Sequence, residues 1–425
     1  MDCIGSIRAM EILDSRGNPT VRVSVVLDSG ARGTSSVPAG ASIGVNEAAE
    51  LRDGDMFRYR GRGVRKAVGN VNDVLAPALM GMDVTRQVEI DDAMREIDGT
   101  ANLERMGANA VLAVSQACAV AAAASNGVPL YTYLGGKDAV RLPMPMINVI
   151  NGGKHADSSL DMQEFMIVPI GAPSFSEALR YGVEIFHALA RILGTRGYTS
   201  AVGDEGGFAP LLTSNEEAFD LIMEAIVAAG YRPGVDICLA LDAAAASFFR
   251  DGNYWLSRTG YRSKTSVQLI ELYQQWVHKY PIVSIEDGIA ESDPAGLREL
   301  MTALGHQIQI MGDDLVVTNP EFIARAIEQG SCNAALIKLN QIGTVSAAIA
   351  AVELCCRAHW HYAVAHRSGE TEDTFIADFA VAMNASHIKT GSVCRGERTA
   401  KYNRLLEIEG ELGARALFGH DARSR

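Results

Sequence analysis

The sequence predicts an α/β protein in which a (β/α) barrel follows a smaller domain of mixed strands and helices. From about residue 142, and most clearly beyond residue 242, short runs rich in Val, Ile, Leu and Ala alternate with amphipathic segments, as in a βα repeat. Polar residues end those runs at intervals of 27, 25, 28 and 23 residues, at Glu286, Asp313, Lys338, His366 and Lys389. Each interval fits one βα unit, so we expect these side chains at the same face of the barrel, where barrel active sites lie.

The first 135 residues predict a separate α+β domain. Residues 21–30 (VRVSVVLDSG) alternate between apolar and polar types and end at a turn, which is typical of a strand. Residues 110–124 are too short and too alanine-rich to span a bilayer, and they predict a buried helix. Residues 37–46 contain AGASIG, small residues without a packing pattern, which we interpret as a mobile loop; a plain connection is the alternative.

Helices are predicted between the strands of the barrel. Ser176 is expected to cap a helix whose apolar positions include Leu179 and Val183 and which stops at Gly197. Residues 215–230 show the same pattern and predict a second helix that ends at a glycine. Amphipathic patterns predict further helices at residues 266–280, 296–305, 320–330 and 345–359.

Composition excludes several classes of protein. A net charge of -13 and a pI near 5.2 argue against nonspecific binding to nucleic acid or to an anionic membrane, because both need a basic surface. The seven cysteines are scattered and form no CxxC pair, so neither a disulfide framework nor a structural zinc site is indicated. The N-terminal residues lack the features of a signal peptide. These observations fit a cytoplasmic protein whose anionic substrate, if it has one, meets a local basic cluster.

Three carboxylates predict a cation site. Asp242, Glu286 and Asp313 each end an apolar run, and oxygen ligands without His or Cys suit Mg²⁺ better than zinc. Any one of them alone is as simply explained as a helix cap or a surface acid. Three at the spacing of barrel units favour the metal site.

Two lysines and two glutamates are candidates for acid–base chemistry. Lys338 ends the strand AALIK and Lys389 stands in HIKTG; each either extends to the surface or, near other cations, acts as a base of lowered pKa. Glu205 in VGDEGGFAP and Glu164 in MQEFMIVP are either capping acids or, with a raised pKa, general acids.

The remaining polar candidates suit an anion. His366, Arg367 and Ser368 form a dense set of donors for a phosphate or carboxylate, with a solvated charge run as the alternative. His155 in NGGKHA is a further donor, although a lone histidine is more often structural. Neither a P-loop nor GxGxxG is present. The whole set suits proton abstraction next to a carboxylate, with a metal ion stabilising the enediolate that forms.

Ten motifs in order make the chain resemble enolase, phosphopyruvate hydratase, over nearly its whole length: EILDSRGNPTV, GASIG, ELRDGD, QEFMI, GDEGGFAP, SIEDG, GDDL, IKLNQIGT, HRSGETED and IKTGS. The resemblance implies an enolase-type TIM-like (β/α)8 barrel over residues 142–425 that opens with ββαα, and an N-terminal α+β capping domain over residues 1–135. It also implies a homodimer or a higher homo-oligomer.

The resemblance also implies roles for individual residues. Lys338 resembles the base that removes the C2 proton of 2-phosphoglycerate, and Glu205, supported by Glu164, the acid that assists loss of the C3 hydroxyl. His155 and His366 would close around the reacting end. The substrate would be bound by Gln163, Arg367, Ser368, Lys389 and Ser42. Two Mg²⁺ ions are implied, the first held by Asp242, Glu286 and Asp313 and the second by Ser42.

The sequence departs from the family pattern near the substrate. The loop usually reads PSGASTG, where this chain has Ala39 and Ile43; the strand before HRSG usually ends in Ser, where it has Ala365. A glutamate is common where it has Ser247. These changes leave open an enolase paralogue such as carboxyphosphonoenolpyruvate synthase, acting on a related three-carbon acid. A noncatalytic surface-binding homologue is a more remote alternative, because the acids, bases and metal ligands are intact.

Overall fold

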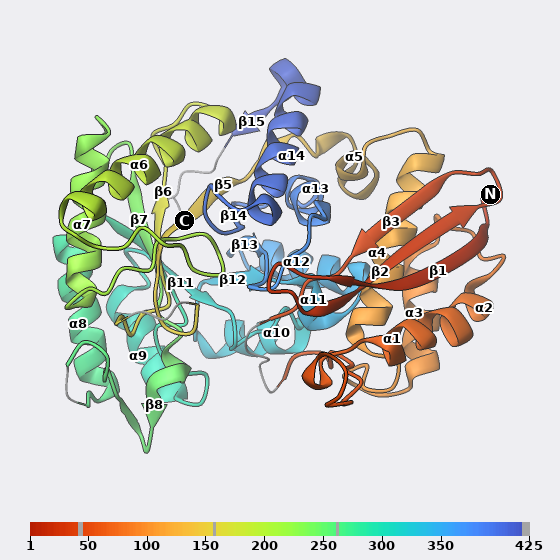
Figure 1. The fold of residues 1–425 in the computed structure, drawn as a ribbon, viewed down its shortest axis with the longest axis horizontal. Helices are drawn as coiled ribbons and strands as arrows, with labels where there is room; N and C mark the ends of the chain where they lie inside the picture. Colours follow the sequence, from red (N-terminus) through yellow and green to blue (C-terminus); the bar gives the residue numbers. More distant parts are fainter. Residues whose placement is uncertain (41–45, 156–158, 261–262, 419–425) are drawn as a thin grey trace.

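The computed structural model describes residues 1–40, 46–155, 159–260 and 263–418. Figure 1 shows a three-stranded sheet and its helices at one end of the molecule and a barrel with its surrounding helices at the other. The α/β class predicted from the sequence is confirmed, including its closed eight-stranded barrel.

The N-terminal sheet is an antiparallel meander. Its strands are β1 (Ile4–Leu13), β2 (Pro19–Leu27) and β3 (Arg32–Ser36), in the spatial order β1-β2-β3. Alternate residues of β2 are fully buried, namely Val21, Val23 and Val25. The period-two pattern read in residues 21–30 therefore predicted this strand correctly, since alternate side chains point to opposite faces of a sheet.

In the part of the chain that the structure describes, the α-helices that cover this sheet or follow it are α1 (Arg65–Gly69), α2 (Ala76–Leu79), α3 (Gln87–Asp98), α4 (Ala108–Ser125) and α5 (Leu130–Gly135). Helix α4 packs directly on β2 and β3 (Figure 1). The backbones approach so closely that a Cβ on Gly33 would lie 2.1 Å from the carbonyl oxygen of Ala117. Helix α4 is long and apolar enough to cross a membrane, but 83% of it is buried inside the protein, as predicted for a core helix.

The barrel closes in the strand order β10-β11-β12-β13-β14-β5-β6-β7. Strand β6 is antiparallel to both of its neighbours, whereas the other barrel strands pair in parallel. The strands are β5 (Met144–Asn151), β6 (Glu164–Val168), β7 (Cys238–Asp242), β10 (Ile282–Glu286), β11 (Gln309–Gly312), β12 (Ala334–Ile337), β13 (His361–Ala365) and β14 (His387–Lys389).

Six barrel helices appear where the sequence predicted them, and the three that begin at Leu339, Phe375 and Gly396 were not predicted. After β5 and β6 come two helices without a strand between them, so the barrel opens with ββαα. The helices are α6 (Phe175–Thr195), α7 (Asn215–Ala228), α8 (Ser266–Lys279), α9 (Pro294–Leu304), α10 (Pro320–Gln329), α11 (Leu339–Ile342), α12 (Val345–Arg357), α13 (Phe375–Ala382) and α14 (Gly396–Leu412). The prediction that Ser176 caps α6 is wrong. Ser174 is the cap, since its hydroxyl accepts the N–H of Glu177 at 3.2 Å.

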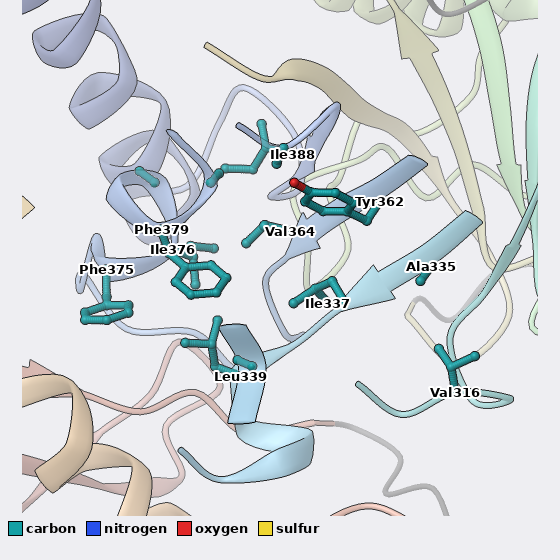
Figure 2. Packing of buried hydrophobic residues seen from close by; sticks show 14 of the residues in the cluster. Val316, Ala335, Ile337, Leu339, Tyr362, Val364, Phe375, Ile376, Phe379 and Ile388 are labelled. Atoms are coloured by element: carbon teal, nitrogen blue, oxygen red, sulfur yellow. The ribbon is translucent and has the colours of Figure 1, made fainter. Parts of the chain in front are cut away.

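Each barrel strand separates two cores. Inward-facing apolar side chains are mostly Met and Ala, and those of β12 are Ala334 and Leu336. The residues between them, Ala335 and Ile337, point outward and pack with residues of the surrounding helices (Figure 2). Strand β13 shows the same alternation. Because both faces of these strands are apolar, polar side chains are placed at the strand ends.

The segment that connects the two parts of the chain runs from the end of α5 at Gly135 to the start of β5 at Met144. In between, β4 (Arg141–Leu142) pairs with β15 (Leu417–Phe418), which ties the start of the barrel to the end of the described chain. One further hairpin, β8 (Phe249–Arg250) with β9 (Asn253–Tyr254), follows β7. We keep the division into residues 1–135 and 142–425 as an interpretation of this arrangement.

Candidate active site

Polar side chains converge on a cavity of about 210 Å³ at one end of the barrel. The lining residues stand at or near the carboxyl ends of the parallel strands. Glu164, the first residue of antiparallel β6, joins them because it pairs with Asp242, the last residue of β7. The lining of the cavity includes Gln163, Glu164, Glu205, Asp242, Asp313, Lys338, His366, Arg367, Ser368, Lys389 and His155. Of the five residues at regular spacing, Asp313, Lys338, His366 and Lys389 line the cavity as predicted, whereas Glu286 does not line it but accepts a hydrogen bond from Lys389.

Lys389 is the cation at the centre of the strand-end carboxylates. Its ammonium nitrogen lies 2.7 Å from Glu286, 3.0 Å from Asp242 and 3.2 Å from Glu164, and all four side chains are buried. Burial alone would lower the pKa of Lys389, but the carboxylates outweigh it and raise the pKa well above its usual range. Lys389 therefore stays charged in this arrangement.

Lys338 forms a second ion pair, with Asp313, in which both side chains are mostly shielded from solvent. Burial opposes the charged lysine, yet the pKa of Lys338 is raised because Asp313 stabilises its positive charge. The same pairing lowers the pKa of Asp313. Gln341 donates a further hydrogen bond to Asp313 at 3.0 Å. A neutral, basic Lys338 thus requires that the charge of Asp313 be balanced in another way.

Asp242, Glu286 and Asp313 come from β7, β10 and the end of β11, which are neighbours in the barrel. They are 3%, 1% and 8% exposed. Burial and the nearby Asp242 raise the pKa of Glu286 to about 8, so the crowded carboxyl groups favour an added positive charge at this point, either a proton or a cation. Hard oxygen donors in a buried, anionic setting fit Mg²⁺.

A neighbouring acidic cluster has a structural purpose instead. Oxygens of Asp287, Asp313 and Asp314 all lie within 4.8 Å of one another. The two oxygens of Asp287, however, accept the backbone N–H groups of Asp313 at 2.9 Å and Asp314 at 3.0 Å. Asp287 therefore fixes the end of β11 and with it the direction of Asp313.

Glu164 and Glu205 face each other beside two histidines. Atoms of His155, Glu164 and Glu205 lie within 4.8 Å of one another, and His155 Nδ1 is 3.4 Å from each carboxylate. Burial and the charge of Glu205 raise the pKa of Glu164 well above its usual range. Burial lowers the pKa of His155 and brings that of His366 to about 4. Both rings are therefore neutral near pH 7.

Glu205 differs from the expectation of a raised pKa. Burial favours its protonated form, but His155, His366 and Arg398 outweigh burial and lower the pKa of Glu205 well below its usual range. The proton of the carboxyl pair is therefore held by Glu164. The sequence could not reveal this, because His155, His366 and Arg398, which surround Glu205, come from segments far apart in the chain.

Arg367 is held in place by the N-terminal domain. Its guanidinium donates to both oxygens of Glu47, at 2.9 and 3.2 Å, and to Asn340 at 3.0 Å. Gln163 donates to Asp242 at 3.2 Å, and Ser368 lines the cavity beside Arg367. Ser42, predicted to bind substrate and the second metal ion, lies outside the described residues, as does the centre of the predicted loop at residues 41–45.

Two of the departures from the family pattern lie at the same cavity. Ala365 and Ser247 line it. Ala39 is buried and pairs with Gly369 through two backbone hydrogen bonds, at 2.8 and 2.9 Å. Ile43 lies outside the described residues. None of the three described substitutions displaces a predicted acid, base or metal ligand from the site.

Sequence reasoning missed three residues that organise the site: Glu47, Asp287 and Arg398. Glu47 follows the predicted loop without any periodic pattern, and Asp287 stands next to Glu286 in the motif SIEDG with no signal that separates its structural contacts from metal binding. Arg398 had a usable signal. In α14, an otherwise polar helix, Arg398 and Lys401 share one helical face with Leu405, and a cation on a buried face needs an anionic or carbonyl partner.

The comparisons with known proteins agree with this geometry. Family models described as "Enolase, N-terminal domain" and "Enolase, C-terminal TIM barrel domain" match residues 4–134 and 139–425. The protein named Enolase 1 of Methylococcus capsulatus is 63% identical over 416 residues, which cover 98% of this chain and 99% of the relative. The Enolase of Desulfotalea psychrophila is 59% identical over 419 residues, with 98% and 99% coverage. Neither name points to the phosphonate paralogue, and the chain belongs to the enolase family.

Proposed function

We infer that this protein catalyses the reversible dehydration of 2-phosphoglycerate to phosphoenolpyruvate, as a lyase of the phosphopyruvate hydratase type. The observation that carries this inference is that Lys338, the Glu164–Glu205 pair and Arg367 line one cavity. Full-length identity of 59–63% to proteins named enolase supports the same reaction.

We assign the removal of the C2 proton to Lys338. The lysine can accept a proton only when it is neutral. Neutral Lys338 is favoured when another cation balances the negative charge of Asp313. A Mg²⁺ ion held by Asp242, Glu286 and Asp313 would balance the charge of Asp313 and the charge that develops on the substrate carboxylate. Lys389, already charged and buried, stabilises the same negative charge.

We assign the loss of the C3 hydroxyl to the carboxyl pair. Glu164 holds a proton while Glu205 is ionised, so the pair carries one proton that it can deliver to the leaving oxygen. His155 and His366 flank the pair and orient it. Arg367 and Ser368 bind the phosphate, and Gln163 contributes to the substrate site.

The cofactor in this proposal is Mg²⁺, two ions per site, with Ser42 as a ligand of the second. We also propose a homodimer or higher homo-oligomer located in the cytoplasm. Among the described residues all seven cysteines are free thiols, which suits a reducing compartment. Sedimentation analysis of the purified protein tests the assembly: a monomer at micromolar concentration contradicts it.

Turnover of 2-phosphoglycerate with Mg²⁺, followed by the absorbance of the enol product, tests the reaction. Two variants separate the roles. Lys338→Ala should abolish both dehydration and exchange of the C2 hydrogen with solvent. Glu205→Gln should abolish dehydration but retain C2 exchange, because the base remains. Absence of turnover by the wild type would sink the proposed function, and C2 exchange by Lys338→Ala would exclude Lys338 as the base.

A further inference from the structure

Arg398 of α14 is completely buried behind the cavity, and it joins two segments that carry site residues. One terminal nitrogen donates to Nδ1 of His366 and to the carbonyl of Arg367, both at 2.6 Å. The other donates to the carbonyls of Asp204 at 3.0 Å and Ser368 at 2.6 Å. All four terminal N–H groups of the guanidinium therefore have an acceptor.

The contact with His366 determines where that ring carries its proton. A guanidinium can donate hydrogen bonds but cannot accept them, so Nδ1 of His366 must be the acceptor and has no proton. A neutral ring then carries its proton on Nε2. An imidazolium is excluded as well, because its Nδ1–H would face the N–H of Arg398.

The Nε2 atom of His366 faces the cavity beside Glu205. It lies 3.3 Å from Oε2 of that carboxylate, a contact without the alignment of a hydrogen bond, and it has no hydrogen-bond partner among the described residues. His366 is 3% exposed and lines the cavity. A buried donor left unpaired in a cavity is poised for an acceptor on a ligand, since catalytic hydrogen bonds often align only when substrate is bound.

We propose that Arg398 is a positioning residue that fixes His366 as the neutral Nε2–H tautomer, so that His366 presents a hydrogen-bond donor, not a proton acceptor, to the reacting end of the substrate. The catalytic meaning of this donor rests on the proposed function, because it would stabilise the departing oxygen and the adjoining Glu205 carboxylate. The tautomer itself does not depend on that function.

The same guanidinium also sets the distance between two segments. It holds the carbonyl of Asp204, next to Glu205, and the carbonyls of the consecutive residues Arg367 and Ser368. Lysine cannot replace it, because three donors on a single nitrogen do not span four acceptors in a plane. Burial lowers the pKa of His366 to about 4, with a smaller contribution of the same sign from Arg398, which agrees with a neutral ring.

The direct test is nitrogen-15 NMR of the Mg²⁺-loaded protein labelled at histidine. His366→Gln identifies the His366 signals among those of the nine histidines. At neutral pH we expect a protonated Nε2 and an unprotonated Nδ1 in the wild type. An Nδ1–H tautomer or an imidazolium would overturn the proposal. This measurement needs neither turnover nor a variant of Arg398, so it gives an answer even if the wild type fails to dehydrate 2-phosphoglycerate.

Variants then test the part played by Arg398. Arg398→Lys should shift His366 toward a mixture of tautomers and lower kcat about tenfold or more, with a smaller change in KM. Lys401→Met is the matched control. Lys401 lies one turn further along α14, is equally buried, and bonds Glu370 and the carbonyl of Thr371 but not His366.

Lys401→Met should lose stability while it keeps the His366 signature of the wild type. An unchanged His366 signature in Arg398→Lys, or the same shift in Lys401→Met, would show that Arg398 does not select the tautomer. If Arg398→Lys does not fold, the wild-type spectrum alone decides the assignment.

Discussion

Lys389 Nζ lies 2.7 Å from Glu286 Oε2, although the two residues end strands on different sides of the barrel. The lysine of β14 reaches across the top of the barrel to carboxylates of β7 and β10. The space between the carboxylates of Asp242 and Glu286 therefore favours a positive charge. The contact also explains why a lysine can remain ionised at 3% exposure.

Binding of Mg²⁺ should stabilise the protein through Glu286. An ion that binds only the folded state at a hundred times its Kd adds about 2.7 kcal/mol to the free energy of unfolding. We expect the thermal midpoint to rise with Mg²⁺ in the wild type and not in Glu286→Gln. Glu291→Gln is the control, because Glu291 is an exposed acid at the same cavity and its loss removes the same charge. Equal shifts in the two variants would contradict the assignment of Glu286 as a ligand.

The ends of the barrel strands could be predicted because geometry leaves little freedom there. A βα unit of nearly constant length returns the chain to the same face, so the spacing of Glu286, Asp313 and Lys338 determined their common location. The cap of α6 could not be predicted as firmly. Ser174 and Ser176 both precede the apolar pattern, and only the backbone geometry distinguishes them.

Long-range partners were beyond the reach of the sequence. Glu47 meets Arg367 across 320 residues of chain, and the guanidinium of Arg398 meets Asp204 across 194. The direction of the pKa shift of Glu205 depends on such contacts, so a motif containing a glutamate could suggest a catalytic acid but not its protonation state.

Loss of the Glu47 carboxylate should destabilise the protein. Arg367 is 6% exposed and has two hydrogen bonds to Glu47, so Glu47→Gln replaces a charged acceptor of a buried cation by a neutral one. We expect a loss of about 2 kcal/mol in the free energy of unfolding, measured by denaturant titration. Glu353→Gln removes the carboxylate partner of Arg357 in an exposed pair and should have no measurable effect. Similar losses in both variants would argue against a special role for burial at Arg367.

The packing of α4 on the sheet predicts a strong effect of one methyl group. In Gly33→Ala the new Cβ would lie 2.1 Å from the carbonyl oxygen of Ala117 and 2.3 Å from the nitrogen of Ala121, so the helix must move. We expect a loss of about 3 kcal/mol. Gly194→Ala is the control, because Gly194 lies in α6 with no atom within 4 Å of the added Cβ, and it should gain about 0.5 kcal/mol. A neutral Gly33→Ala would mean that α4 and β3 are not in close contact.

His366 should make the stability of the protein depend on pH between about 4 and 6.5. Burial lowers the pKa of His366 in the folded protein to about 4, whereas the unfolded chain keeps a value near 6.5. Between these values the unfolded state binds more protons, so the free energy of unfolding falls as the pH falls. At pH 5 the loss relative to pH 7 amounts to about 2 kcal/mol. In His366→Gln the amide oxygen can still accept from Arg398, but no proton is bound, so this loss should disappear. Denaturant titrations of wild type, His366→Gln and the surface control His306→Gln at pH 7 and pH 5 measure it. A wild type and a His366→Gln variant with the same pH dependence would show that the His366 ring is not kept neutral by burial.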